Sequence, residues 1–506
     1  MSTRGRAKTG NLEADIVIIG GGGTGLAAAV AAKENGASKV ILLEKRGVTG
    51  GNTAMSMGPF GVDSPVQKRA AIEFRRDEVF RIAMNWAHWK TNPRIVRAFI
   101  DKSGDTIRWL EDKGIEFKCM PLYPNQSPLT WHMPKGYGAE IVKVLTKECQ
   151  KLGVEILTRT PAKKILIGAN GGVSGVLAER EGKEFTITTA SVVIGTGGYS
   201  GNKELLKKYC PDYRDNMKCD GVLHTGDGLL MAMEVGAATE GLGLLLLSGP
   251  QIPQAVAMKI GSYADGVPEP LMAIALEPNT VWVNKRGQRF IDEGTSYHHF
   301  ESSNAVNRQP GNLCYTLLDS LLVQTMSEKG LIIGLGRHTV EERTKMPGLA
   351  AELRVLADKG WVKIADSWDG IADWIGADPE VLKATVEEYN AACDRGHDPI
   401  FAKDRVLLVP LRTPPYYAIR SNSDFLDTIG GIKINEHMEV LDKQGNPIPG
   451  LYAGGVTTGG WQEGTYCDML SGTASGFALN SGRIAGENAV KKFASGSKLN
   501  SHKRQE

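Results

Sequence analysis

Three glycines near the N-terminus have the spacing that binds the phosphates of a dinucleotide. Gly20, Gly22 and Gly25 form a G-x-G-x-x-G pattern directly after an apolar run at residues 15–19. The first glycine permits a tight turn, the second lets the backbone approach a pyrophosphate, and the third lets a helix lie close on a sheet. The phosphates then lie at the helix N-terminus, where free N–H groups and the helix dipole favour negative charge.

An acidic residue completes this pattern. Glu44 follows a second apolar run at residues 39–43, where its carboxylate can accept hydrogen bonds from ribose hydroxyls. The alanine-rich segment 26–34 between the two runs predicts a helix, so residues 14–45 form a strand, helix and strand unit. The complete unit predicts dinucleotide binding more specifically than the glycine spacing alone.

Composition and charge exclude several other kinds of partner. The chain has 506 residues, with 59 Lys and Arg against 57 Asp and Glu, so the formal net charge of +2 predicts neither nucleic acid nor an anionic membrane surface as a partner. No apolar run approaches the roughly 20 residues that cross a bilayer. The basic first 15 residues contain no apolar signal segment, which predicts a cytoplasmic location.

The cysteines predict no metal centre. The 7 cysteines form no C-x-x-C pair and no cluster with histidine at metal-ligand spacing. Their odd number also argues against a disulfide framework. We therefore expect no metal, haem or iron–sulfur site in this chain.

Further glycine-rich segments extend the dinucleotide signal over most of the chain. They are GGNTAMSMG at 50–58, SVVIGTGG at 191–198, GDG at 226–228, NKRGQRF at 284–290 and GLYAGG at 450–455. With them the sequence resembles the flavoprotein family of fumarate reductase, succinate dehydrogenase and 3-ketosteroid dehydrogenase, which implies FAD. Members that attach FAD covalently have a histidine before the Thr-Ala pair. Asn52 stands at that place, so the resemblance implies non-covalent FAD.

The glycine pattern and the resemblance together predict the FAD-binding residues. These are Gly20, Gly22, Gly23, Thr24, Gly25, Glu44, Lys45, Gly50, Gly51, Asn52, Thr53, Met57, Gly58, Ala162, Thr196, Gly197, Asp227, Gly454, Gly455, Gly472, Thr473 and Ala474. The last three begin the final predicted helix, whose N–H groups would face the flavin and stabilise negative charge on its reduced form.

Two predicted domains must position these residues. The fold class is α/β, with a doubly wound, Rossmann-like FAD-binding domain and an inserted α+β cap that would hold the substrate. The sheet pattern stops near residue 243 and returns after Pro410 with a strand-like segment and a long final helix. We therefore assign 1–243 and 409–506 to the FAD-binding domain and 244–408 to the cap.

Several departures from fumarate reductase argue against a dicarboxylate substrate. That branch has an arginine proton donor eight residues after Arg289, where this sequence has Tyr297. Its His-Thr-Met segment is replaced by Asp427-Thr-Ile, and its later arginine by a residue near Met469. A doubly charged substrate would therefore lack the fork-shaped cationic partners that bind carboxylates.

The replacements resemble the 3-ketosteroid dehydrogenase branch, in which tyrosines occupy the catalytic positions. The resemblance assigns Tyr466 to polarising the substrate carbonyl, Tyr297 to proton transfer and Tyr123 to relaying that proton. A phenol O–H can donate to a carbonyl oxygen and stabilise an enolate. Tyr297 could act as a base only if its pKa, ordinarily about 10, were lowered. His298 and His299 are weaker candidates for the acid.

The predicted function is FAD-dependent oxidoreduction at a CH–CH bond. The reaction would be α,β-desaturation of a cyclic ketone of the 3-ketosteroid or cyclohexanone type, or the reverse reduction of the enone. Alternatives are a fumarate-reductase-like reductase of another activated alkene or acid, and an electron-transfer flavoprotein subunit. Only one complete dinucleotide unit is present, which leaves the electron acceptor or donor open.

Overall fold

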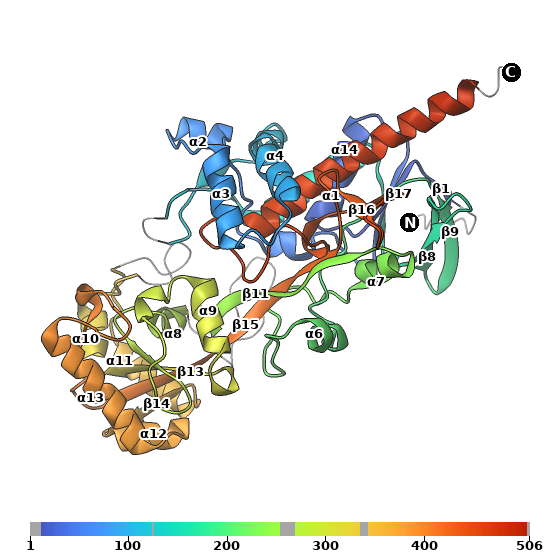
Figure 1. Ribbon diagram of the computed structural model, residues 1–506. Helices are drawn as coiled ribbons and strands as arrows, with labels where there is room; N and C mark the ends of the chain where they lie inside the picture. Colours follow the sequence, from blue (N-terminus) through green and yellow to red (C-terminus); the bar gives the residue numbers. More distant parts are fainter. Residues whose placement is uncertain (1–11, 124–125, 253–268, 334–342, 503–506) are drawn as a thin grey trace, which may run out of the picture.

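The protein has two bodies joined by two long strands. The structure is a computed structural model that describes residues 12–123, 126–252, 269–333 and 343–502. Figure 1 shows the larger body around helices α1, α4 and α14, and the smaller body around α10 to α13. Strands β11 (Thr239–Gln251) and β15 (Tyr416–Ile432) run between them. No helix of the described residues is both long and apolar enough to cross a membrane.

A six-stranded sheet forms the centre of the larger body. Its order is β16 (Glu439–Leu441), β17 (Pro447–Ala453), β10 (Val192–Ile194), β2 (Ile16–Ile19), β3 (Val40–Glu44) and β6 (Glu155–Thr158). All neighbours pair in parallel except β16, which is antiparallel to β17. Every residue of β2 and β3 is buried, as expected of central strands covered on both faces. The predicted doubly wound α/β domain is confirmed.

Close helix packing on this sheet depends on small residues. The alanine-rich helix α1 (Gly23–Glu34) packs against the final helix α14 (Thr473–His502). A Cβ at Gly482 would collide with the Thr24 carbonyl, and a Cβ at Gly486 with that of Ala28. The two helices can therefore approach closely only because these positions of α14 are glycine.

A second sheet lies beside the first. Its order is β1 (Leu12–Glu13), β9 (Lys183–Thr188), β8 (Val173–Arg180) and β7 (Ala162–Ile167). The last three strands form an antiparallel meander. They form a sheet of their own instead of extending the edge of the central sheet. Three helices connect or cover this part of the body: α5 (Tyr137–Lys151), α6 (Lys203–Tyr209) and α7 (Asp227–Glu234).

Three helices and a strand pair form the helical flank of the larger body. It contains α2 (Pro65–Arg69), α3 (Arg76–Trp86), α4 (Pro93–Glu111) and the strand pair β4 (Phe117–Cys119) and β5 (His132–Pro134).

The smaller body has its own sheet and its own buried core. Strand β15 pairs with β11 along one half and with β13 (Cys314–Asp319) and β14 (Val362–Ala365) along the other, and β12 (Val281–Val283) pairs with β13. The helices are α8 (Glu269–Ala275), α9 (His299–Asn307), α10 (Ser320–Glu328), α11 (Leu349–Asp358), α12 (Trp368–Ile375) and α13 (Pro379–Arg395). A cluster of buried apolar side chains from Ile252 to Ile419 fills this body. We propose that it is the substrate cap, with 243/244 and 408/409 as its boundaries.

Candidate functional site

A cavity of about 450 Å³ extends from the central sheet to the smaller body. Its walls come from the loops after β2, β3 and β10, from the start of α14, and from β11, α8 and α9. The carboxyl ends of parallel strands are where doubly wound folds bind ligands. One long site can therefore hold a nucleotide at the sheet and a substrate beneath the cap.

The glycine turn at the sheet end has the geometry that the sequence predicts. Gly20 has a φ of +105°, and a Cβ there would collide with the Gly195 carbonyl. A Cβ at Gly25 would collide with the Gly20 carbonyl, so this glycine is required for helix α1 to lie on the strand. No side chain caps α1, and its first turn contains no acidic residue. Its N-terminus is therefore suited to a pyrophosphate.

Glu44 is held at the end of β3 by two backbone amides. Gly21 N donates to Oε2 at 2.8 Å, and Arg46 N donates to Oε1 at 2.7 Å. The carboxylate lines the cavity and is 8% exposed. Each oxygen retains a lone pair, so the oriented carboxylate can still accept hydrogen bonds from ribose hydroxyls.

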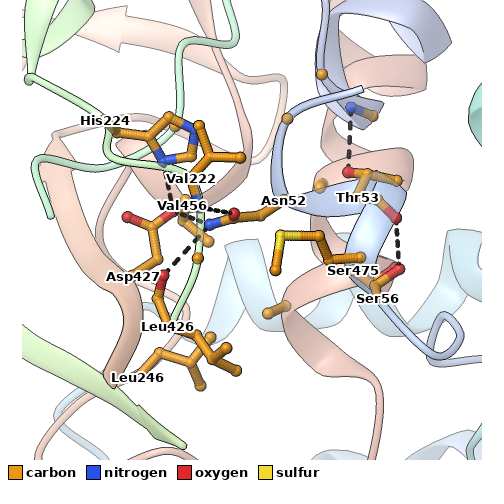
Figure 2. A pocket seen from close by; sticks show the side chains of 18 of the residues that line it. Asn52, Thr53, Ser56, Val222, His224, Leu246, Leu426, Asp427, Val456 and Ser475 are labelled. Atoms are coloured by element: carbon orange, nitrogen blue, oxygen red, sulfur yellow. Dashed lines mark hydrogen bonds and ion pairs between the residues drawn. The ribbon is translucent and has the colours of Figure 1, made fainter. Parts of the chain in front are cut away.

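Asn52 is the centre of a buried polar network in the middle of the cavity (Figure 2). Its Nδ2 donates to Asp427 Oδ2 at 2.9 Å, and its Oδ1 accepts from Val222 N at 2.6 Å. His224 Nδ1 lies 2.8 Å from the same Asp427 oxygen. The residue at the place of the covalent histidine is therefore fixed by residues on two distant segments of the chain.

Tyr466 lies on the loop that precedes α14 and lines the cavity. Its ring is buried, and its hydroxyl oxygen accepts a hydrogen bond from Ala474 N at 2.8 Å. Burial raises the pKa of Tyr466 to about 12. The phenol therefore keeps its proton at neutral pH and can donate it to an oxygen atom of a bound substrate.

Tyr123 and Tyr297 lie together, but neither lines the cavity. Their ring centroids are 6.3 Å apart, and the His298 ring packs against both, at 4.2 Å from Tyr123 and 4.7 Å from Tyr297. Burial raises the pKa of Tyr297, and the carboxylates of Asp292 and Asp404 raise it further. The lowered pKa that a base at Tyr297 requires is therefore absent, and this environment suits a proton donor.

Most predicted residues line this one cavity. The lining includes Gly20, Gly22, Gly23, Thr24, Glu44, Lys45, Gly51, Asn52, Thr53, Met57, Gly58, Ala162, Thr196, Gly197, Asp227, Tyr466, Gly472 and Ala474. Gly25, Gly50, Gly454, Gly455 and Thr473 lie outside the lining. Two of them form backbone hydrogen bonds that hold the surrounding loops: Gly50 N donates to Gly21 O, and Gly454 N donates to Ile194 O.

Sequence reasoning missed much of the lining at the cap end. Apolar side chains dominate there, namely Leu246, Leu247, Met272, Leu276 and Phe300. The polar residues missed include Asp220, His224, Ser248 and Gln251. His224 precedes the Gly226-Asp227-Gly228 turn, and that proximity is the one local signal that could have indicated it.

The chain belongs to the FAD-binding domain family, because the model described as "FAD binding domain" matches residues 15–467. It is an FAD-dependent oxidoreductase that acts on CH–CH bonds. The uncapped α1, the oriented Glu44 carboxylate and the elongated cavity fit this cofactor.

Individual relatives span nearly the whole chain. A vinyl phenol reductase from Lactiplantibacillus plantarum is 33% identical over 487 residues, covering 94% of this chain and 96% of its own length. The solved open conformation of a flavocytochrome c3 fumarate reductase has a TM-score of 0.70 and 26% identity, over 96% of this chain and 79% of its own. The solved 3-ketosteroid Δ1-dehydrogenase from Sterolibacterium denitrificans shares the fold, with a TM-score of 0.74 and 19% identity, over 96% of this chain and all of its own.

Proposed function

We propose that the protein reduces the carbon–carbon double bond of an uncharged substrate whose alkene is conjugated to a ketone or to a phenol ring. The reverse reaction is the desaturation of a cyclic ketone. Bound FAD in its reduced form would supply a hydride to one alkene carbon, and the other carbon receives a proton. The main support for this proposal is the composition of the cap end of the cavity. It offers a protonated tyrosine hydroxyl and, among the described residues, neither arginine nor lysine.

The charged side chains of the lining support an uncharged substrate. Lys45 and Arg46 lie beside Glu44 at the nucleotide end of the cavity. Lys45 Nζ forms an ion pair with Asp227 Oδ2 at 2.7 Å. Asp220 lies in the lining, and burial raises the pKa of its carboxyl to about 6, so it is mostly ionised at neutral pH. An anionic Asp220 would repel a substrate carboxylate.

Tyr466 has the chemistry that both kinds of substrate need. Hydride addition to an enone places negative charge on the ketone oxygen, and a vinyl phenol carries an oxygen conjugated with its alkene. A hydroxyl held by the helix amide of Ala474 can donate to that oxygen without reorganising. Vinyl phenol is a neutral conjugated alkene, so the name of the 33% identical relative supports this substrate class.

A binding experiment with oxidised holoprotein tests the proposal. Cyclohexanone-type ketones and simple phenols should perturb the flavin absorbance in a saturable way, and succinate should not. Tyr466→Phe should weaken binding of the neutral ligands about tenfold, which corresponds to the loss of one hydrogen bond. Saturable binding of succinate with no response to any neutral ligand would overturn the proposal.

A further inference from the structure

Two carboxyl groups and an imidazole meet where α9 contacts the loop after Tyr466. His298 caps the start of α9, Glu301 lies in its first turn, and Asp468 lies on the loop. One ligand atom from each residue lies within 4.8 Å of the other two. The Asp468 side chain is 0% exposed, and that of His298 is 25% exposed. We call these three residues the 298/301/468 cluster.

Three of the four carboxylate oxygens of this cluster have no hydrogen-bond donor among the described residues. Neither oxygen of Asp468 accepts a hydrogen bond from any residue that the structure describes, nor does Glu301 Oε2. Burying two ionised carboxylates without donors costs several kcal/mol per ion. A hydrogen bond between the two carboxyls removes this cost, and such a bond needs one proton shared between them.

The groups around the cluster connect it to the catalytic candidates. The titratable groups that interact with the pair are His298 and Tyr123 on one side and Tyr466 and Cys467 on the other. His298 Nδ1 lies 3.5 Å from Asp468 Oδ2, and its ring packs on Tyr123. The Phe300 ring, adjacent to Glu301, packs on Tyr466 at 4.6 Å.

We propose that Glu301 and Asp468 share one proton and that the 298/301/468 cluster stores the proton consumed by alkene reduction. This inference rests on the function proposed above. His298 connects the buried pair to solvent, because its side chain is 25% exposed and its Nδ1 lies 3.5 Å from Asp468 Oδ2. The cluster then restores the proton that Tyr466, the tyrosine in the cavity lining, gives to the substrate. It acts through Tyr466 and positions the proton without touching substrate.

The balance of the step is simple. In each reductive turnover a hydride, which bound reduced FAD would supply, and a proton replace the alkene π bond with two new C–H bonds. The proton leaves the Tyr466 O–H, Tyr466 is reprotonated from the shared carboxyl, and water replaces that proton through His298. No group of the cluster is oxidised or reduced.

The charge of the cluster predicts its pH dependence. Burial raises the pKa of Glu301 to about 7, and the neighbouring Asp468 carboxylate raises it further in the same direction. The shared carboxyl is therefore protonated below this pKa and loses its proton as the pH rises through it. Removing the Asp468 charge should lower the pKa of Glu301.

Infrared spectroscopy of the holoprotein tests the proton sharing without any substrate. Asp424 is another buried carboxyl, and burial raises its pKa to about 7. It lies outside the cavity lining, so Asp424→Asn is the matched control. The same substitution removes the Asp424 band, so the other variants are made in this background. In this background a carboxylic C=O band should disappear as the pH rises through about 7. Glu301→Gln should remove the band, and Asp468→Asn should shift its titration to lower pH.

Single-turnover kinetics test the role of the store. In wild type and in Asp424→Asn, the rate of flavin oxidation by the alkene should fall as pH rises through about 7. Glu301→Gln should remove this fall and lower the rate about 10- to 100-fold with unchanged KM, below the usual effect of a direct acid because water can partly substitute.

Three results would overturn the inference. The first is the absence of the infrared band in Asp424→Asn, a measurement that needs no change in the cluster. The second is an unaltered pH profile in Glu301→Gln. The third is binding of one equivalent of Mn²⁺ or Zn²⁺ that Asp468→Asn abolishes, because the cluster would then be a metal site. The infrared band is independent of turnover, so failure of the proton store is separable from failure of the proposed function.

Discussion

Replacing Glu44 by glutamine should weaken FAD binding about 10- to 150-fold. The side chain keeps its shape but loses the charge that strengthens hydrogen bonds to ribose hydroxyls, and a charged hydrogen bond contributes about 1.5–3 kcal/mol. A second effect follows from the two amides that hold Glu44, Gly21 N and Arg46 N. The glutamine NH₂ must face one of them, which leaves a buried N–H without an acceptor.

The two effects can be separated because they act on different states. The mismatched amide is present with and without FAD, so it lowers the melting temperature of the apoprotein. The lost ribose contact is present only with FAD, so it raises the Kd measured by fluorescence quenching of FAD added to apoprotein. Asp15→Asn is the matched control, because Asp15 also accepts from two amides, Ser38 N and Lys39 N, on the same body outside the cavity. An unchanged Kd in Glu44→Gln would refute the ribose contact.

Three further changes have distinct expected results. Tyr466→Phe should lower kcat/KM about 100-fold with full FAD content, as for a lost oxyanion donor, and a wild-type value would remove Tyr466 from the mechanism. Acid denaturation followed by filtration should release all FAD, because Asn52 forms no covalent bond to it, and flavin retained on the polypeptide would contradict this. Arg289→Met should destabilise the smaller body by about 3–5 kcal/mol, because it removes the cation 2.7 Å from both Glu293 and Asp398 and leaves Glu293 paired with Lys403 alone. Thermal melting should show this loss but little change for Arg412→Met, whose ion pair is on the surface, and equal melting of the two variants would argue against it.

The dinucleotide unit could be predicted because its determinants are local. The strand, the glycine turn, the helix and Glu44 lie within 31 consecutive residues, 14–44, and the structure confirms a steric reason for Gly20 and for Gly25. Most of the residues for which the family resemblance predicts FAD binding line one cavity.

The cap end and the polar networks could not be predicted because their partners are distant in sequence. Asn52 and Asp427 are 375 residues apart, and His224 and Asp427 are 203 apart. Glu301 and Asp468 look like ordinary surface acids in the sequence, and only the fold brings them together in a buried contact. The conformation around Tyr297 likewise decides the direction of its pKa shift, which no local pattern encodes.

Anaerobic mixing of the photoreduced holoprotein with alkenes tests the central claim most directly. Flavin absorbance should recover rapidly with a cyclohexenone or with a vinyl phenol, because either fits an apolar cap end with a tyrosine hydroxyl donor. Fumarate should leave the flavin reduced, since the described lining offers its carboxylates no arginine or lysine at that end. Rapid recovery with fumarate and none with either neutral alkene would contradict the account.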